Sequence, residues 1–470
     1  MAIIKNHRAS FEKLNKLLNL SNGKLSISAI GIKDAKVTVL KTHPKGFKVE
    51  CLLSKKVEIG KPYDATISFG ADKYFLKRLM FNSESFDANN EVKGFRYVYA
   101  GEVHTIFSRK QKQHAAFHRL ILPIPKNPDL FRYFDTISFR NETLQYNRCL
   151  IELTFQKGSF HFYEIHVDDK YFIVIDGLQK QAFRIFYQSA YLMLVSYGFI
   201  TSCFYQEDGY YLTSQNKDFA KIDFVFYYEL RDSLISNYAL IYTNAYSYLE
   251  NNTKLASKIQ PTLKTLSSKV LNNLLNKLDE NIDFLVSILT IIEGNITSLV
   301  LRPACYSVAM ERFNKIFLDE NEGLKPVQDK AVAKAIRMEL QQVVEKYTAH
   351  IGENAFNILS KKIANINSPT NRDKLVKPFE ILGIALTQND IEAIDNRNSF
   401  LHGLKPQIAS EDVPDKKSLE GHYYLSLRLH FLVNRLILKY LGFDGKMINY
   451  VKLHEHVTGI KVAEDIFVNV

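Results

Sequence analysis

The sequence predicts an α+β protein with more than one domain, in which an antiparallel β-rich part precedes an all-α part. In the first half, turn residues separate short runs of alternating apolar and polar residues, as in Ala65-Thr66-Ile67-Ser68-Phe69. Beyond about residue 232, apolar residues instead recur every three or four positions, which is the period of a helix. The chain has 470 residues, 46% of them hydrophobic, so it is long enough for two or three domains with substantial cores.

The first domain is expected to span residues 1–230 and to form a sandwich or barrel-like β structure. A short amphipathic helix is predicted at 5–20 and a second helix at 180–199. Asp168-Asp169 is a turn signal between two strand-like runs. The predicted strands are 25–30, 35–40, 47–53, 63–69, 95–107, 117–124, 150–155, 160–167, 171–175, 202–205, 210–213 and 224–230.

The second domain is expected to span residues 231–470 and to be a helical bundle. Asn, Pro and Gly residues separate its helical runs, as at Pro303 and Gly403. The predicted helices are 232–250, 261–279, 281–299, 303–318, 326–349, 352–365, 372–386, 389–402 and 417–441.

The composition and the motifs that are missing exclude several classes of function. A formal charge of +11 and a pI near 9.1 fit a polyanion partner such as RNA. The cysteines form no C-x-x-C pair, and the N-terminus has no apolar signal core, so a reduced, cytoplasmic protein is expected. The most apolar run, 284–301, contains Glu293 and Asn295, which makes it too polar for a lone membrane span. Phosphate-binding, metalloprotease and hydrolase motifs are missing, so no metal and no cofactor are expected.

The stretch from Ile394 to Gly403 contains the candidate catalytic residues. Arg397, Asn398 and His402 place a permanent cation, a carboxamide and an imidazole within six residues. Such a set suits chemistry on a phosphodiester, because the guanidinium can hold the phosphate while the imidazole moves protons. Arg and His at this spacing also occur by chance, since Arg109 and His114 repeat it in a polar stretch that reads as a loop.

Helical geometry restricts how these residues can meet. Asn398 and His402 are four residues apart and share a helix face, whereas Arg397 and His402 lie about 140° apart around the axis. The two side chains converge if the Arg side chain bends round, or if a second copy of the helix completes the site. The second arrangement predicts a homodimer with a composite site on its two-fold axis.

The ends of this helix have recognisable signals. Thr387 or Asn389 can cap its start, where Asp390 suits the positive end of the helix dipole. His402 would lie in the last turn, where free carbonyl groups favour imidazolium, so a raised pKa is expected. Basic residues along 417–441, such as Arg428, are expected to face solvent or RNA phosphate.

Glu293 ends an apolar stripe that begins near Ile282. Two interpretations are open: Glu293 is a surface acid at the edge of the stripe, or it faces the bundle interior and pairs with a cation such as Arg397.

Three features together resemble the HEPN superfamily, and most closely its Apea-like branch from bacterial antiphage proteins. They are the run 284–293, the helix end Asp395-Asn396-Arg397-Asn398-x-x-x-His402-Gly403, and the closing segment 436–446. The resemblance covers about residues 280–450. It implies an α-helical HEPN bundle and a metal-independent endoribonuclease active as a homodimer.

The resemblance also implies roles for single residues. Arg397 would bind the scissile phosphate, and His402 would act as base on the ribose 2′-hydroxyl or as acid to the leaving 5′-oxygen. Asn398 would orient the imidazole or touch the phosphate, with Asp395 and Glu293 in supporting positions. The expected substrate is tRNA or another cellular RNA, cut during phage defence when a phage component triggers the β-rich domain.

Two other functions remain open. A non-catalytic HEPN module would bind a ligand or partner protein, with the β-rich domain for recognition. Alternatively, the β-rich domain would bind carbohydrate or peptide, and the helical part would serve for dimerisation.

Overall fold

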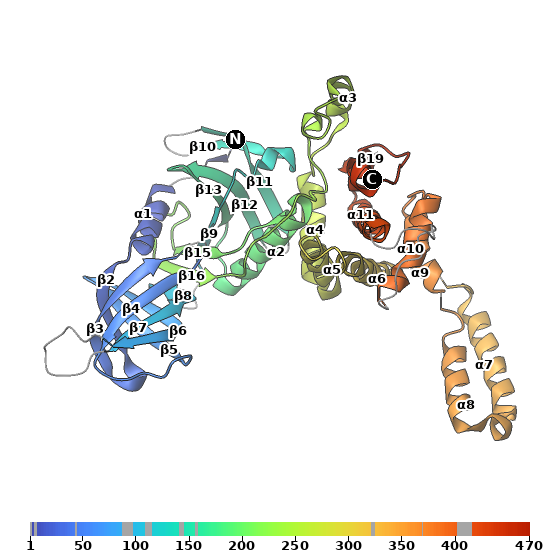
Figure 1. Cartoon of the computed structure of the whole chain (residues 1–470), viewed down its shortest axis with the longest axis horizontal. Coiled ribbons are helices and arrows are strands. Elements are labelled where there is room, and N and C mark those ends of the chain that lie inside the picture. The colour runs from blue at the N-terminus through green and yellow to red at the C-terminus, as the bar shows by residue number, and fades with distance from the viewer. Residues whose placement is uncertain are drawn as a thin grey trace. The chain divides into compact units, whose positions relative to one another are not determined.

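The computed structural model describes residues 2–3, 7–42, 45–86, 97–108, 115–140, 145–155, 158–320, 325–368, 370–401 and 416–470. The chain divides into two compact units, Met1–Asp279 and Glu280–Val470, here called unit 1 and unit 2 (Figure 1). Unit 1 contains an antiparallel β-rich region, and unit 2 is largely helical. The α+β multidomain class predicted from the sequence is therefore confirmed.

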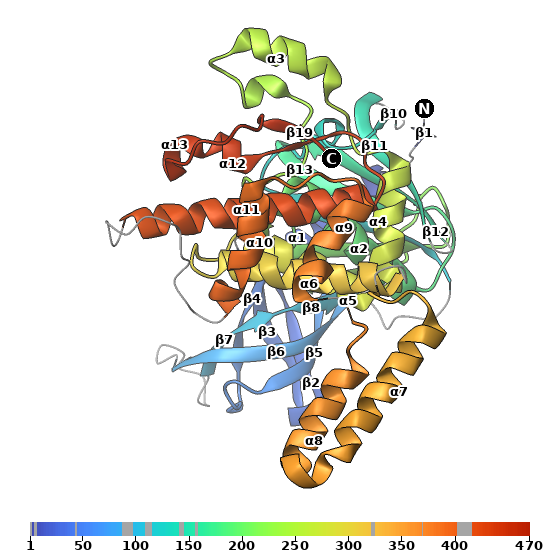
Figure 2. The same ribbon diagram turned by 90° about the vertical axis from the view of Figure 1, so that its right-hand side faces the viewer.

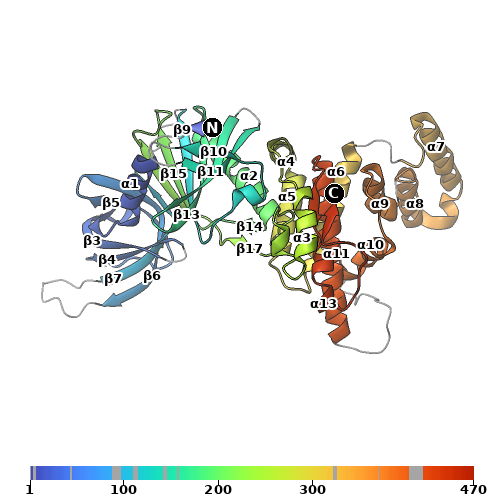
Figure 3. The ribbon, with the colours of Figure 1, turned by 90° about the horizontal axis from the view of Figure 1, so that it is seen from above.

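The strands of unit 1 pair into one large sheet of 15 strands, in the order β1-β10-β11-β12-β13-β9-β15-β16-β8-β6-β5-β2-β3-β4-β7. Because β7 also pairs with β6, the strands from β6 through β5, β2, β3 and β4 to β7 close into a ring. The remaining strands form an open part of the sheet (Figure 3). The strands are β1 (Ala2–Ile3), β2 (Asn22–Ile27), β3 (Ile32–Lys41), β4 (Phe47–Leu53), β5 (Pro62–Phe69), β6 (Asp72–Phe86), β7 (Tyr97–Val103), β8 (Thr105–Phe107), β9 (Phe117–Ile124), β10 (Ile137–Arg140), β11 (Gln145–Phe155), β12 (Gly158–Val167), β13 (Lys170–Gly177), β15 (Asp208–Ser214) and β16 (Phe224–Glu229).

Alternation of side chains explains the ring. In β4 the residues Phe47, Val49, Cys51 and Leu53 are buried, and those between them are half-buried. This is the period-2 pattern of a strand with one face on a core. Two-residue hairpin turns support the register, as at Asp168-Asp169, where both residues adopt positive φ and join β12 to β13.

A buried ion pair ties helix α1 (His7–Leu18) to the open part of the sheet. Arg119 of β9 contacts both carboxylate oxygens of Asp176 of β13, at 2.6 and 2.9 Å. Arg119 also donates to the Ser10 hydroxyl at 2.8 Å, and the Tyr163 hydroxyl donates to Asp176 at 2.9 Å. Every charge in this cluster therefore has a partner, as burial requires.

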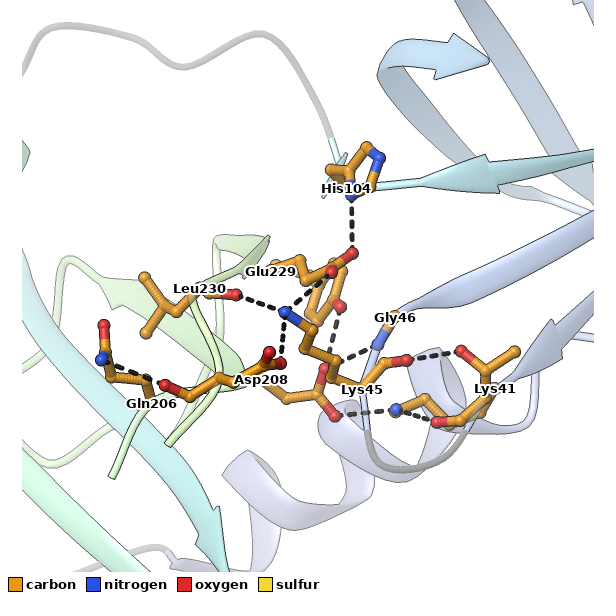
Figure 4. A network of polar contacts seen from close by, with 11 residues as sticks. Lys41, Lys45, Gly46, His104, Gln206, Asp208, Glu229 and Leu230 are labelled. Carbon is orange, nitrogen blue, oxygen red and sulfur yellow. Dashed lines mark hydrogen bonds and ion pairs between the residues drawn. The ribbon is translucent and has the colours of Figure 1, made fainter. Parts of the chain in front are cut away.

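Asp208 connects the ring to the open part of the sheet (Figure 4). This carboxylate is buried on β15 and forms an ion pair of 2.7 Å with Lys41 at the end of β3. It also accepts the Gly46 N–H at 3.1 Å and the Tyr227 hydroxyl at 2.9 Å. Three donors thus converge on one side chain from both parts of the sheet.

A second set of contacts lies beside the first. Lys45 reaches Glu229 of β16 at 3.4 Å and Asp232 at 2.9 Å. His104 Nδ1 lies 2.7 Å from the other oxygen of Glu229. Burial alone would lower the pKa of Lys45, but Asp232 and Glu229 outweigh it and raise this pKa.

Unit 1 extends further along the chain than the sequence predicted. Helix α2 (Phe183–Thr201) is followed by a short sheet of β14 (Cys203–Phe204) and β17 (Leu234–Ile235). The helix predicted at 232–250 was wrong, because that stretch contains β17, irregular backbone and the short 3₁₀ turn η3 (Ala245–Ser247).

Helices α3 (Thr253–Ile259) and α4 (Ser268–Glu280) follow this stretch, with η4 (Gln260–Thr262) between them. The Asn272 side chain of α4 accepts the Thr154 N–H of β11, which ties α4 to the sheet. The two compact units therefore meet at 279/280 rather than near the predicted boundary of 230.

Unit 2 is a helical assembly in which α10 and α11 pack on each other and on α6. Figure 2 shows α10 crossing α11. A two-stranded sheet of β18 (Lys446–Ile448) and β19 (Phe467–Asn469), which the sequence did not predict, closes the unit with α12 (Tyr450–Leu453) and α13 (Glu455–Thr458). The other helices are α5 (Ile282–Gly294), α6 (Arg302–Glu320), α7 (Lys330–Lys346), α8 (Thr348–Ala364), α9 (Asn371–Ile381), α10 (Gln388–Leu401) and α11 (Lys416–Tyr440).

Removal of the Asp208 carboxylate should destabilise unit 1. Asp208→Ala leaves the half-buried Lys41 without its ion pair and two donors without an acceptor, so the free energy of unfolding should fall by about 3 kcal/mol. Asp232→Ala is the matched control, because its side chain is 80% exposed and its loss should cost less than about 1 kcal/mol. Urea unfolding followed by circular dichroism measures both, and equal effects would contradict the assignment.

Candidate functional site

Helix α10 carries the predicted motif, and its first turn is closed by a capping box. The Thr387 hydroxyl accepts the Asp390 N–H at 3.2 Å. Asp390 in turn accepts the Thr387 N–H and hydroxyl, each at 2.8 Å. This reciprocal pair satisfies backbone donors that a helix start leaves open. The predicted cap at Thr387 is therefore present.

One face of α10 points into unit 2. Asp390, Ala393, Ile394 and Arg397 are buried, at the i, i+3, i+4 and i+7 spacing of a single helix face. A cation and an anion thus occupy positions that apolar residues normally fill. Both need partners from neighbouring helices.

Asp390 finds its partner on α11. Arg428 Nε lies 2.7 Å from Asp390, and its Nη2 contacts Glu464 and donates to the Thr387 hydroxyl at 2.9 Å. The Arg428 side chain is fully buried, so the expectation that it faces solvent or RNA was wrong. Hydrogen bonds and the charge of Glu464 and Asp390 raise the pKa of Arg428 against the opposing effect of its burial.

Arg397 is the motif cation, and its side chain is 5% exposed. Its Nη2 lies 3.1 Å from Oε1 of Glu311, a half-exposed residue of α6. Burial lowers the pKa of Arg397, although Glu311 and Asp395 oppose this effect. Glu311 contacts one terminal nitrogen of this guanidinium, which has five N–H donors in all.

The structure does not describe all of the other predicted site residues. His402 and Gly403 lie outside the described residues, as do Arg109 and His114, so neither the meeting of Arg397 with His402 nor the pKa expected for His402 is tested. Asn398 lies in α10, but its side chain also lies outside the described part.

The supporting acids lie at the surface. Asp395 is exposed, and one of its carboxylate oxygens lies 3.9 Å from Nε of Arg372 of α9. Glu293 is exposed in the last turn of α5, which agrees with the first of the two interpretations of this residue. The ion-pair partner of Arg397 is Glu311, which the sequence analysis did not single out.

His430 of α11 is a buried imidazole that sequence reasoning also missed. Its ring makes edge contacts with Tyr306 of α6 and Tyr450 of α12, at centroid distances of 5.2 and 5.9 Å. Burial, with a smaller effect of Arg302, lowers its pKa from 6.5 to about 3. The neutral ring therefore acts as a packing element between helices. Its place between Leu427 and Phe431 in an apolar run was the available signal.

Comparisons with known proteins leave the resemblance resting on the motif residues alone, because no family model, no curated protein and no solved structure matches this chain. Within the described residues, no three His, Cys, Asp or Glu side chains are grouped so that they could hold a metal ion. Nor does any helix in that part of the chain have the length and apolarity needed to cross a membrane.

The arrangement around Arg397 can bind an anion. The guanidinium is held by the helix face that Arg428 anchors, and its carboxylate partner is half-exposed and open to competition. A phosphate oxygen could share or replace Glu311 as acceptor, since Arg binds both groups in similar geometry.

Acid should destabilise the packing around His430. Its folded pKa of about 3 lies below the unfolded value of 6.5, so stability present above pH 6.5 is lost as the pH falls toward 3. The free energy of unfolding then falls by up to about 1.4 kcal/mol for each pH unit. His430→Phe keeps an aromatic ring and removes this proton uptake, so the variant should gain stability over the wild type on acidification. Urea unfolding at pH 7, 6 and 5 measures this gain, with the exposed His456→Phe as control; parallel pH profiles would rule it out.

Proposed function

We propose that the chain is a metal-independent endoribonuclease of the HEPN type. The observation that carries the proposal is the position of Arg397: it lies one turn before the end of α10, five residues before His402 in the sequence, on a helix fixed to α11 and α6. The basic charge of +11 supports an RNA substrate. The resemblance of 280–450 to HEPN domains supplies the reaction class.

The proposed reaction is an internal transesterification. His402 takes the proton of the ribose 2′-hydroxyl, whose oxygen then attacks the adjacent phosphorus. The bond from phosphorus to the 5′-oxygen breaks, and the leaving oxygen receives a proton. Arg397 stabilises the charge that develops on the phosphate oxygens. The products are a 2′,3′-cyclic phosphate and a 5′-hydroxyl end, and no oxidant, metal or cofactor enters the balance.

Glu311 limits the binding of RNA at this site. Its carboxylate neutralises Arg397 in the folded chain, and an incoming phosphodiester must compete with it. Because Glu311 is half-exposed, its release into water carries a modest cost. Glu311 therefore sets how strongly the site attracts RNA.

A second copy of the chain would complete the site. Arg397 and His402 lie about 140° apart around one helix axis, so two α10 helices related by a two-fold axis can supply one residue each. The α7–α8 hairpin provides a surface for such an association, because it projects from the other helices of unit 2 (Figures 1 and 3).

The hairpin exposes apolar residues that an isolated helix pair cannot bury. Only Ala333 of α7 is buried, and α8 has no buried residue. A pair of helices in water is marginal without further packing. The exposed apolar residues are Val332, Ile336, Met338, Val343, Ile358 and Leu359.

Charge along the hairpin favours a second copy as the partner. The half nearest its base is basic, and the half nearest its turn carries the acids. Antiparallel association of two hairpins would place each basic half against an acidic half. The basic residues near the base are Lys330, Lys334, Arg337, Lys361 and Lys362, and the half near the turn has three acids, Glu339, Glu345 and Glu353, and one basic residue, Lys346.

In this proposal the chain is a cytoplasmic toxic effector in phage defence. Unit 1 would sense a phage-encoded trigger, and unit 2 would cut tRNA or another cellular RNA. This role rests on the resemblance to Apea-like antiphage proteins.

One observation favours a second candidate function. Arg397 is buried and already paired with Glu311, as a purely structural arginine would be. A non-catalytic HEPN module that binds a ligand or partner protein would keep this pair closed.

The nuclease is tested with purified protein and total RNA in EDTA. Wild type should cut RNA and leave 2′,3′-cyclic phosphate ends, while Arg397→Ala and His402→Ala should lose at least about 100-fold in rate, since each removes a transition-state interaction. Arg372→Ala, an exposed arginine of α9, is the matched control and should keep its activity. If all four proteins cleave equally, or none does with the triggering phage present, the binding module is the better account.

Glu311→Gln should strengthen RNA binding. The amide keeps a hydrogen bond to Arg397 but removes the competing negative charge. We expect KM to fall about 3- to 10-fold, with a steeper loss of affinity at high salt. Glu320→Gln, another acid on α6, is the control. A higher KM in Glu311→Gln would show that the carboxylate positions Arg397 for RNA instead of competing with it.

The hairpin is tested by charge insertion. Ile336→Glu with Ile358→Glu should weaken self-association at least about 100-fold, because each buries a carboxylate in the apolar contact. Ile185→Glu, at an equally exposed position on α2, should leave it unchanged. Analytical ultracentrifugation measures the dissociation constant; a wild-type monomer, or a dimer insensitive to the double change, contradicts the assignment.

A further inference from the structure

Unit 1 contains a pocket of about 520 Å³, here called the arginine pocket. It lies where η2 (Leu130–Arg132), the start of β11 and the segment after η4 meet, far in sequence from the α10 motif. Three cations and one carboxylate line it, so its lining carries a net charge of +2. The lining residues are Phe131, Arg132, Asp135, Arg148, Thr243, Gln260, Leu263, Lys264, Thr265 and Ser267.

Two guanidinium groups share one aromatic ring in this pocket. Arg132 lies 4.6 Å and Arg148 lies 5.8 Å from the centre of the Phe131 ring. The ring face attracts both cations and so holds like charges close together. Within the described residues, neither guanidinium has a carboxylate at ion-pair distance. Two concentrated positive charges of this kind are complementary to a dianion.

The backbone at Arg148 departs from regular strand geometry. Arg148 has a φ of 53°, which is uncommon for a residue with a side chain, and it lies where the register of β10 and β11 shifts. Its N–H donates to the Ser138 hydroxyl at 3.2 Å. A bulge of this kind re-aims a side chain, and residues held at positive φ cluster at binding sites.

Hydrogen bonds fix the backbone of Arg132 and its neighbours. The Arg132 carbonyl accepts the Thr243 N–H at 3.0 Å and the Thr243 hydroxyl at 2.9 Å. Gln260 donates to the Thr243 carbonyl at 2.8 Å, and Leu266 N–H donates to the Tyr133 carbonyl at 2.8 Å. The backbone that carries Arg132 is therefore held in place without a ligand, which reduces the entropy cost of binding.

We propose that the arginine pocket binds the terminal phosphate of a phosphomonoester, held between Arg132 and Arg148. A phosphomonoester carries a charge of −1.5 to −2 at pH 7, which matches the lining. The pocket volume is that of a site for a small molecule, so a nucleotide or sugar phosphate fits better than an extended RNA strand. Thr265 and Ser267 supply hydroxyl groups for further phosphate or ribose oxygens.

The proposal is tested by calorimetric titration of the full chain with AMP, ribose 5-phosphate, inorganic phosphate and adenosine. AMP and ribose 5-phosphate should bind, and adenosine should bind at least 10-fold more weakly. A DNA trinucleotide with a 5′-phosphate, compared with its 5′-hydroxyl form, shows whether a nucleic-acid end is accepted. DNA lacks the 2′-hydroxyl that the proposed cleavage needs, so this result is independent of the nuclease.

Variants then place the ligand. Arg132→Ala and Arg148→Ala should each weaken AMP binding at least about 10-fold, while Arg184→Ala, an exposed arginine of α2, should leave it unchanged. Phe131→Leu keeps an apolar side chain but removes the ring, and it should weaken binding less than loss of either arginine. The proposal is overturned if no phosphomonoester binds at millimolar concentration or if adenosine binds as well as AMP. It is also overturned if the variant that combines Arg132→Ala with Arg148→Ala binds AMP like wild type.

Discussion

The buried contact between Arg428 and Asp390 fixes the element on which the proposed chemistry depends. Arg428 has no exposed side-chain surface, and Asp390 is nearly as buried. Burial of such a pair carries a large desolvation cost, which further contacts to its donors and acceptors reduce. Glu464 and the Thr387 hydroxyl provide such contacts to Nη2 of Arg428, whereas its buried Nη1 has no hydrogen-bond partner among the described residues. The start of α10, the middle of α11 and the segment after α13 are thereby joined at one point.

Arg397 benefits from this anchor because it is seven residues beyond Asp390 on the same helix face. The first turn of α10 is fixed by these contacts, and the side chain of Arg397 is contacted by Glu311. In the proposed site, Arg397 is thus a cation on an anchored helix, and Glu311 is the partner that a phosphate would replace. Glu311 is half-exposed while Asp390 is buried, so the two ion pairs on this helix face differ in strength.

Local patterns predicted most elements of the fold, and the exceptions have physical causes. Strands β4 and β9 were predicted with the bounds that the structure gives. Strand β4 alternates buried apolar residues with half-buried ones, and β9 has an apolar run from Leu120 to Ile124 after the polar His118 and Arg119. Strand β6 was missed because its buried residues change parity, from Tyr74 and Leu76 to Leu79 and Phe81. Arg78 between them has a φ of 56°, and such a bulge hides a strand from a period-2 search.

At the candidate site, too, local sequence patterns pointed to some residues, whereas contacts between distant parts of the chain were not predictable. The motif identified Arg397 from sequence alone, but nothing near Glu311 marks it as the partner, since α6 and α10 are far apart in the chain. The sequence did contain a sign that Arg428 is buried, although a solvent-facing position was predicted. Arg428 lies three residues after Leu425 and four before Leu432, within the apolar stripe of α11. The arginine pocket depends on three segments that only the fold brings together.

The central claim is that Arg428 holds α10 in place and thereby fixes the position of Arg397. Hydrogen–deuterium exchange of Arg428→Met tests it most directly, because exchange reports local opening of single helices. The account predicts that amides of α10 exchange at least about 10-fold faster in the variant, while those of the neighbouring α9 do not change. Unchanged exchange in α10 would contradict the claim, since the helix would then be held without its buried ion pair.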